Sequence, residues 1–476
     1  MDIINAPDFE DHVQEILDLL HTPGLAIAII QDGNIESKAV GMASLEPPKP
    51  VTPDTLFDIA SSSKSLTAAC VALLVEDNER YPQVQWDSKV SSLLPDDFVM
   101  AEKRYTDDIT VEDILCHRTG LPSHLIEKLT GQTFEDFLHQ HILKPLGMTS
   151  THLQPDAAIA AGLEERMAIQ YTWVDEQLKA VPWMQTPEQQ GCGSIFTSVN
   201  DYIKYVQAMT DRQHPFTNEI VTAVTTPRII ANPGEEINEL GPRSSPTLYA
   251  LGWENIWYRG HKVIQHNGLI TGSGSLHFFV PDLNFGGVVL ANSDTASSIG
   301  TVLVKEMLDL LIGIPVRERD EHVALERGKI EKEKEQLRGD ALKKKIWPTF
   351  DGTTEPQKIP LASYTGEYWN AGYHGLRVQI KNEELFVDAT DRSDGFVLQF
   401  EHVRGQTMYV AHLATRCGDV ELEPEELEAE FRFDNDRVVK MGINLEFVLE
   451  DKIWFDRVIR PSSRESSRAG EAFTWV

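Results

Sequence analysis

The chain has 476 residues, of which 41% are hydrophobic and 25% are charged, and its formal net charge is −31. This length and composition are typical of a globular protein of two or three domains, and they exclude low-complexity sequence. The negative charge repels phosphate backbones and anionic lipid headgroups, so we expect neither nucleic acid nor a membrane as a partner.

Secretion and metal binding are not expected either. The amino terminus, MDIINAPDFEDHVQEILDLL, has acidic side chains where a secretory signal carries positive ones, and no apolar run approaches membrane-spanning length. The cysteines Cys70, Cys116, Cys192 and Cys417 stand far apart and in no metal-ligand spacing. We therefore expect a cytoplasmic protein without a disulfide framework.

The first part of the chain predicts a helix, a hairpin and a buried helix. Residues 9–20 are amphipathic, and residues 24–44 predict two strands joined by a turn at Asp32-Gly33, a pair that tight hairpins favour. Residues 63–77 have the small and apolar content of a helix that is buried on most sides.

Residues 109–210 look mostly helical, and strands return after them. Segments between residues 247 and 294 alternate strand patterns with turn residues, and residues 299–314 predict another helix. Sheet, helices and sheet again predict a layered α/β or α+β fold, in which the first and last strands share one sheet.

A boundary follows in the charged segment 317–345, whose mixed signs at helical spacing predict an exposed connecting helix. Beyond it, short alternating strands separated by turn signals predict a small antiparallel β domain. We therefore expect a first domain over residues 1–315, a charged helical linker over 316–357, and an antiparallel β-barrel-like domain over 358–476.

The segment SSSK, residues 61–64, is the candidate catalytic motif. Positions i and i+3 of a helix share a face, so Ser61 can present its hydroxyl to Lys64, whereas Ser62 and Ser63 point elsewhere. At the start of a helix, the Ser61 N–H is a free donor that would stabilise an oxyanion. Burial would favour an uncharged Lys64 amine, which can accept the serine proton. The alternative is that Ser61 only caps the helix and Lys64 reaches solvent.

Six pieces of the chain carry a family resemblance: LFDIASSSKSLTAA, VEDILCHRTGLP, LTGQTFEDFLHQHILKPLGMTSTHL, GCGSIFTSVNDYIKYV, YALGW and HNGLITGSGSLHFFVPDLNFGGVVLANS. In this order they resemble the serine β-lactamase and penicillin-binding-protein superfamily, in the branch that also holds esterases, D-aminopeptidases and acyltransferases. They lie within residues 10–315. Residues 361–458 resemble, more weakly, the lipocalin-like domain appended to many such proteins. The resemblance implies a β-lactamase/transpeptidase-like domain with an antiparallel sheet flanked by helices.

This resemblance also assigns roles at the candidate motif. It implies that Ser61 is the acyl-accepting nucleophile and that Lys64 accepts its proton. The backbone N–H of Leu269 should then be the second oxyanion donor, next to that of Ser61. Because Leu269 would act through its main chain, the identity of its side chain need not matter.

The triplet His266-Asn267-Gly268 falls where the family has K-T-G or H-x-G, on the strand that faces the nucleophile. The resemblance implies that these residues bind substrate, and that Gly268 lets the substrate approach the strand closely. Without Ser61, His266 would be interpreted as a satisfied histidine in a sheet. Histidine grips a carboxylate less firmly than lysine does near neutral pH, so esters, thioesters or amides are expected rather than penicillin-type anions.

The family's third element, a Tyr-x-Asn or Ser-x-Asn triplet, is missing. It belongs between HRTGLP and the following helix, where this chain has only residues 125–128, so we expect a shortened helical subdomain. Because the tyrosine shuttles the proton to the leaving group, its loss should lower the rate by orders of magnitude, although Ser-Lys pairs do catalyse acyl transfer. Tyr105, Tyr171 and His117 are candidates to fill the gap, without a positional argument for any. A splice variant or an erroneous gene model would leave the same gap.

We therefore expect a serine hydrolase or acyltransferase that forms an acyl-enzyme on Ser61 from a small-molecule ester, thioester or amide. This chemistry needs no metal and no organic cofactor. The alternative is a catalytically impaired relative that keeps the fold and serves as a binding or regulatory protein.

Overall fold

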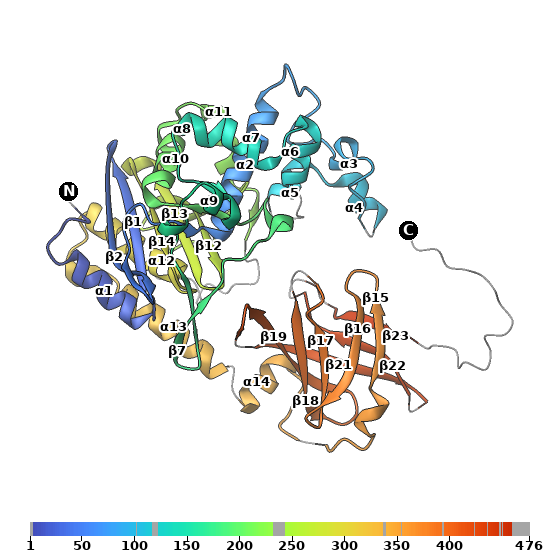
Figure 1. The fold of residues 1–476 in the computed structure, drawn as a ribbon. Helices are drawn as coiled ribbons and strands as arrows, with labels where there is room; N and C mark the ends of the chain where they lie inside the picture. The colour runs from blue at the N-terminus through green and yellow to red at the C-terminus, as the bar shows by residue number, and fades with distance from the viewer. Residues whose placement is uncertain are drawn as a thin grey trace. The chain divides into compact units, whose positions relative to one another are not determined.

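The computed structural model describes residues 3–100, 102–116, 122–231, 243–336, 339–353, 355–392, 395–422, 424–435, 437–446, 449 and 451–458. The chain divides into two compact units, Met1–Glu326 and Arg327–Val476 (Figure 1). Each unit has its own hydrophobic core.

The first unit is built on a nine-stranded antiparallel sheet with the order β3-β2-β1-β14-β13-β12-β11-β10-β9. The early strand β1 pairs with the late strand β14, so the two ends of this region share one sheet, as predicted. The strands are β1 (Gly24–Gln31), β2 (Asn34–Leu45), β3 (Pro48–Pro50), β9 (Ile229–Ile230), β10 (Leu248–Tyr249), β11 (Glu254–Tyr258), β12 (His261–Ile270), β13 (Ser273–Val280) and β14 (Phe285–Ala291).

The predicted hairpin turn joins β1 to β2. Asp32 has a φ of 48° and Gly33 a φ of 81°, so both residues are left-handed, as a type I′ turn requires. The strands are in register from Gln31 opposite Asn34 to Gly24 opposite Gly41.

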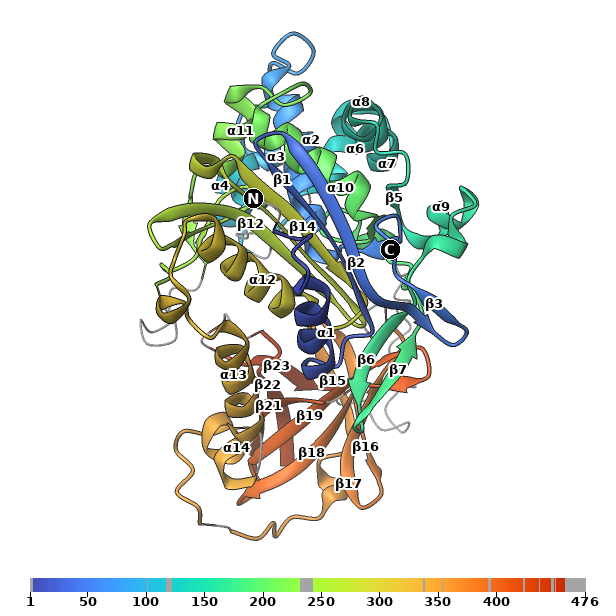
Figure 2. The same cartoon turned by 90° about the vertical axis from the view of Figure 1, so that its left-hand side faces the viewer.

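Helices cover both faces of this sheet (Figure 2). Helices α1 (Phe9–Leu19) and α12 (Ala296–Leu311) lie on one face, where α12 packs against β13 and β14. Helix α10 (Val199–Asp211) packs against β1 and β14 from the other side, and α2 (Ser63–Glu76) is buried in the core that it shares with α10.

The remaining helices of the first unit are short. They are α3 (Val90–Leu93), α4 (Lys103–Asp108), α5 (Val111–Leu115), α6 (Pro122–Thr130), α7 (Phe134–Leu138), α8 (Lys144–Leu146), α9 (Pro155–Ala160) and α11 (Asn218–Thr225), and a π-helix over His139–Leu143 joins α7 to α8. Helices α6, α7 and α11 pack against α2.

Residues 109–210 contain more strand than their sequence suggests. The hairpin of β6 (Gln170–Val174) and β7 (Gln177–Val181) turns at Asp175 and Glu176, both with positive φ. Neither turn residue is the glycine or asparagine that marks such a turn, so the pattern is hard to recognise. A separate small sheet has the order β4-β8-β5, with β4 (Phe57–Asp58), β8 (Ile195–Thr197) and β5 (His152–Leu153).

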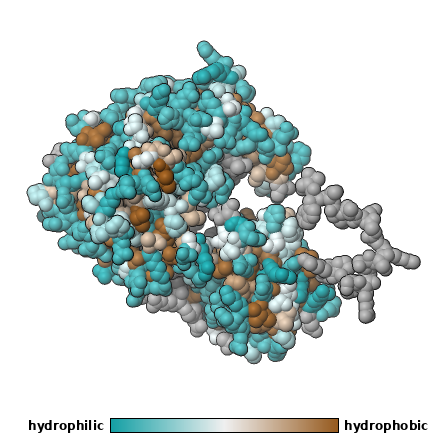
Figure 3. All heavy atoms as spheres, in the orientation of Figure 1, coloured by the Kyte–Doolittle hydropathy of each residue, from teal (hydrophilic) through white to brown (hydrophobic). Residues whose placement is uncertain are grey.

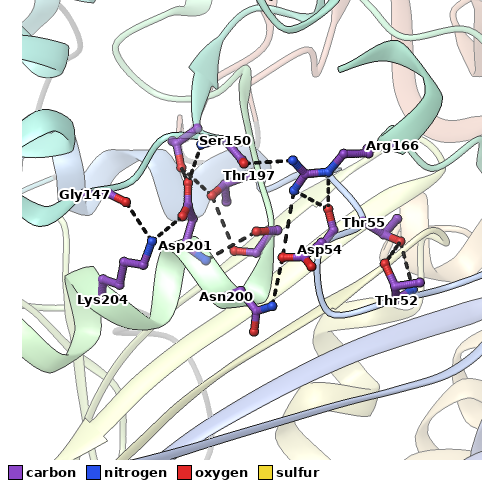
Figure 4. Close-up of polar contacts among 12 residues, drawn as sticks. Thr52, Asp54, Thr55, Gly147, Ser150, Arg166, Thr197, Asn200, Asp201 and Lys204 are labelled. Atoms are coloured by element: carbon purple, nitrogen blue, oxygen red, sulfur yellow. Dashed lines mark hydrogen bonds and ion pairs between the residues drawn. The ribbon is translucent and has the colours of Figure 1, made fainter. Parts of the chain in front are cut away.

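A polar network anchors the start of α10, directly after β8 (Figure 4). The buried Asp201 carboxylate accepts hydrogen bonds from the Ser150 N–H at 2.6 Å and from Lys204 Nζ at 2.7 Å. Arg166 donates to the Ser150 hydroxyl at 3.0 Å and to the main-chain oxygen of Asp54 at 2.7 Å. Because β8 pairs with β4, this network supports the strand that leads to Ser61.

The second unit is a closed eight-stranded antiparallel barrel, which confirms the predicted β domain. The order is β18-β17-β16-β15-β23-β22-β21-β19, and β19 pairs back with β18. The strands are β15 (Gly366–Asn370), β16 (His374–Lys381), β17 (Glu384–Ala389), β18 (Phe396–Arg404), β19 (Met408–Cys417), β21 (Glu425–Asp434), β22 (Arg437–Ile443) and β23 (Ile453–Arg457), and β20 (Val420–Glu421) adds to β19. Aromatic rings, including those of Tyr364, Tyr368 and Phe431, fill the interior.

Two further helices, α13 (His322–Gln336) and α14 (Gly339–Ile346), precede the barrel in the chain. Hydrophilic residues cover most of the face that Figure 3 shows, and hydrophobic residues form small separate patches on it. None of the helices in the described residues combines the length and the apolar character needed to cross a membrane.

Candidate active site

Ser61 lies in a sharp turn between a strand and the buried helix α2. Strand β4 ends at Asp58, a 3-10 turn covers Ala60–Ser62, and α2 begins at Ser63. Ala60 has a φ of 45°, a left-handed conformation that costs a residue with a side chain about 1–3 kcal/mol. The turn is therefore strained at the residue that precedes the candidate nucleophile.

The Asp58 carboxylate contacts this strained residue. Its Oδ1 accepts a hydrogen bond from the Ala60 N–H at 2.8 Å, and the Asp58 side chain is almost fully buried. Burial raises the pKa of Asp58 to about 7, and the Ala60 hydrogen bond opposes this shift. From the sequence, Asp58 is expected only as a carboxylate that caps the helix after it, and nothing in the sequence marks the left-handed conformation of Ala60.

Ser61 and Lys64 lie within hydrogen-bond distance of each other. Lys64 Nζ is 2.6 Å from Ser61 Oγ and 3.3 Å from the main-chain oxygen of Cys192. Both side chains are half-buried. Burial lowers the pKa of Lys64 below its ordinary 10.5, and the nearby Cys192 opposes this in part. The i,i+3 spacing thus brings the hydroxyl and the amine within hydrogen-bond distance, as a nucleophile and its base require.

The other two serines of the motif point elsewhere. Ser62 Oγ is 2.7 Å from Ser275 Oγ and donates to the main-chain oxygen of His266 at 3.2 Å, so it ties the turn to β13 and β12. Ser63 is fully buried, and its hydroxyl has no hydrogen-bond partner within the described residues.

Gly268 brings β12 into contact with the turn. A Cβ at this position would overlap the main-chain oxygen of Ile59 and lie 2.5 Å from Ser275 Oγ. Position 268 therefore requires glycine because β12 packs closely against the turn. A role for Gly268 in substrate approach stays a prediction.

His266 lies on the same side of β12 as Gly268. The residue is 3% exposed, with Nε2 at 2.9 Å from the Tyr249 hydroxyl and Nδ1 at 2.5 Å from the main-chain oxygen of Asn267. The His266 side chain is thus engaged with the protein. Contact of His266 with a substrate stays a prediction.

Asn267 and Leu269 alternate to the opposite side of β12. The Leu269 side chain is 55% exposed, and a Cβ built on Gly274 would lie 3.7 Å from Leu269 Cδ1 and 2.9 Å from Ala296 of α12. Leu269 can therefore face Ser61 only through its main chain.

The last five residues of β12, 266–270, pair with a neighbouring described strand along one edge only. Strand β11 pairs with β12 from Tyr258 opposite His261 to Glu254 opposite Gln265, whereas β13 pairs with β12 as far as Ile270. Among the described strands, none pairs with the other edge of residues 266–270. This is the edge on which the predicted oxyanion donor, the Leu269 N–H, would have to lie.

Helix α6 packs against the segment that carries Cys192. A Cβ on Gly191 would lie 2.8 Å from Ser123 Oγ, and Gln190 Nε2 donates to Glu127 Oε1 at 3.1 Å. Helix α6 thus helps to hold the Cys192 carbonyl that Lys64 contacts. No local motif marks these residues, because their contacts join segments more than sixty positions apart in the chain.

The tyrosines considered as substitutes for the missing triplet have other partners. The Tyr171 hydroxyl is buried and accepts from the Leu45 N–H at 2.8 Å, and the Tyr105 hydroxyl, on a side chain that is 44% exposed, accepts from Arg104 at 2.8 Å. The third candidate, His117, lies outside the described residues.

Comparison with known proteins matches almost the whole chain. Residues 9–125 and 123–306 match the β-lactamase family, and residues 351–457 match a domain of unknown function, DUF3471. The two stretches of the first match meet at residues 123–125, close to where the Tyr-x-Asn triplet would belong.

Two fungal relatives extend over both units. The unguisins hydrolase ungD of Aspergillus violaceofuscus is 32% identical over 470 residues, covering 84% of this chain and 81% of the relative. The unguisins hydrolase ungD' of Aspergillus campestris is 31% identical over 506 residues, covering 94% of this chain and 91% of the relative.

A solved structure shares the fold over nearly the full length. The octameric penicillin-binding protein homologue from Pyrococcus abyssi has a TM-score of 0.56 at 19% identity, and the match covers 96% of this chain and all of that one. The family model covers more than half of the chain, and two relatives above 30% identity extend over most of it. The chain therefore belongs to the β-lactamase family of serine hydrolases.

Proposed function

We propose that Ser61 and Lys64 hydrolyse an ester, thioester or amide of a small molecule through an acyl-enzyme on Ser61. The observation that carries this proposal is the 2.6 Å distance between Lys64 Nζ and Ser61 Oγ at the start of a buried helix. The relatives named as unguisins hydrolases favour water as the acceptor of the acyl group. Transfer to an alcohol or amine would use the same acyl-enzyme.

The neutral Lys64 amine takes the Ser61 proton as Oγ attacks the carbonyl carbon of the substrate. The tetrahedral intermediate then collapses, and Lys64 returns the proton to the departing alcohol, thiol or amine. In the second half, Lys64 takes a proton from water, the resulting hydroxide attacks the acyl carbon, and Ser61 leaves with the proton restored. Lys64 thereby serves first as the base and then as the acid. In the family, the missing tyrosine carries the proton to the leaving group.

The oxyanion needs donors beside Ser61. The N–H of Ser61, in the 3-10 turn that leads into α2, and the N–H of Leu269, on the edge of β12, are proposed for this role. His266, Asn267 and Gly268 are proposed to bind the substrate. Their stretch of β12 is held against the turn, since Gly268 packs on Ile59 and the His266 carbonyl accepts from Ser62.

A non-catalytic binding or regulatory protein is the second candidate. The break in the family match at residues 123–125 favours it, because the segment that carries the tyrosine belongs there. Both candidates share the fold, so reactivity at Ser61 must separate them.

Labelling with a fluorophosphonate probe tests the proposal. The wild type should be labelled on the peptide that contains Ser61, and Ser61→Ala should abolish the label. Ser63→Ala is the matched control, because the Ser63 hydroxyl is buried and should not react. Absence of label on well-folded wild type would favour the binding protein.

Hydrolysis of a p-nitrophenyl ester then tests the base. Lys64→Ala should lower kcat by roughly 10²–10⁴-fold, the range that general acid–base catalysis supplies. A variant with unchanged kcat would remove Lys64 from the proposed mechanism.

A further inference from the structure

We propose that Asp58 is a positioning residue, whose carboxyl holds Ala60 in the left-handed conformation that directs the Ser61 hydroxyl toward Lys64. This inference rests on the proposed function of Ser61. Its central observation is the hydrogen bond from the Ala60 N–H to Asp58 Oδ1 at 2.8 Å, made at the one residue between β4 and Ser61 whose φ is positive.

The two residues before Ala60 are fixed by neighbouring strands. The main-chain oxygens of Asp58 and Ile59 accept hydrogen bonds from Ser273 Oγ at 2.9 Å and from Ser275 Oγ at 2.7 Å, and the Ile59 N–H donates to the Ile195 carbonyl at 2.9 Å. The chain therefore enters Ala60 in a set direction.

The residues after Ser61 are fixed as well. Ser62 Oγ contacts β12 and β13, and α2 begins at Ser63. With both ends held, the conformation of Ala60 sets how the chain passes from β4 into the helix. The Ser61 hydroxyl must lie on the Lys64 side of that helix to be 2.6 Å from Nζ.

An alanine does not adopt a left-handed conformation without compensation. The Asp58 carboxyl supplies it, because it accepts an N–H that would otherwise be buried without a partner. Either protonation state of the carboxyl can accept this hydrogen bond, so the interaction needs the oxygen atom and not the charge.

This distinction between acceptor and charge defines the variants. Asp58→Asn retains an oxygen at the same position, whereas Asp58→Ala removes it. Ala60→Gly makes the left-handed conformation available without a steric penalty. The double variant D58A/A60G should therefore regain the turn that Asp58→Ala loses.

The experiment compares fluorophosphonate labelling rates of Ser61 in full-length protein, with circular dichroism as the test of folding. Asp58→Ala should be labelled roughly 10–100-fold more slowly, the loss expected when a reacting group is displaced by about 1 Å. Asp58→Asn and D58A/A60G should stay within about threefold of the wild type. Labelling of folded Asp58→Ala at the wild-type rate, or Asp58→Asn and D58A/A60G as slow as Asp58→Ala, would overturn the inference.

Amide hydrogen exchange at Ala60 gives a readout that does not depend on reactivity. Exchange should be faster in Asp58→Ala than in the wild type and should stay slow in Asp58→Asn. If the wild type is not labelled at all, the proposed function fails, whereas unchanged exchange in Asp58→Ala contradicts the Asp58–Ala60 contact itself.

Discussion

The charge of Lys64 sets the pH range of the proposed reaction. Burial lowers the pKa of Lys64 below 10.5, so the neutral amine forms at a lower pH than on a free lysine. We expect kcat/KM for an ester substrate to rise with pH and to level off above an apparent pKa that is lower than 10.5. Lys64→Arg, which stays charged throughout, should lose activity across the range. A rising limb that persists in Lys64→Arg would assign the titration to another group.

Asp58 should make the protein less stable as pH rises, whereas a salt-bridged acid with a lowered pKa makes a protein more stable as pH rises. The pKa of Asp58 is raised from 3.8 to about 7, so between these values the folded state keeps a proton that the unfolded state releases. Stability therefore falls as pH rises from about 4 to about 7, by about 4 kcal/mol in total.

The comparison that isolates this effect is with Asp58→Asn. The free energy of unfolding of the variant, relative to the wild type, should increase with pH over that window and then stay constant. Urea unfolding at about pH 5 and about pH 8 measures it. Parallel curves for the two proteins would show that Asp58 ionises in the folded protein as it does in the unfolded chain.

At the scale of elements, the contact between α6 and the loop at Gly191 supports the site. Gly191→Ala would place a Cβ 2.8 Å from Ser123 Oγ and so push the neighbouring Cys192 carbonyl away from Lys64. We expect this variant to be labelled more slowly at Ser61, by roughly tenfold or more. The double variant S123G/G191A removes the hydroxymethyl group that collides, and should recover most of the rate. A slow double variant would assign the loss to the backbone of the loop.

Patterns in the sequence predicted the features that depend on residues close together in the chain. The turn at Asp32-Gly33, the buried helix after Ser63 and the i,i+3 spacing of Ser61 and Lys64 each depend on residues a few positions apart. The approach of Gly268 to Ile59 and of Cys192 to Lys64 joins segments more than one hundred residues apart. Such contacts follow from how the strands pack, and no periodicity in one segment records them.

At the scale of the whole molecule, the barrel has a core of its own. Leu398 lies fully buried in it, so Leu398→Ala should destabilise the barrel by about 2–5 kcal/mol. Because a compact unit with its own core can unfold by itself, calorimetry should show one transition shifted to lower temperature. Labelling of Ser61 at room temperature should not change. A matching loss of labelling would show that the two units are energetically coupled.

The cysteines of this protein allow a fluorophore to be attached selectively. Cys70, Cys116 and Cys417 are buried, whereas Cys192 is exposed and its carbonyl contacts Lys64. A maleimide fluorophore would therefore attach at a single cysteine, the one next to Lys64 in the proposed catalytic centre. A change in its emission on addition of a small molecule would report binding near Lys64 without requiring turnover.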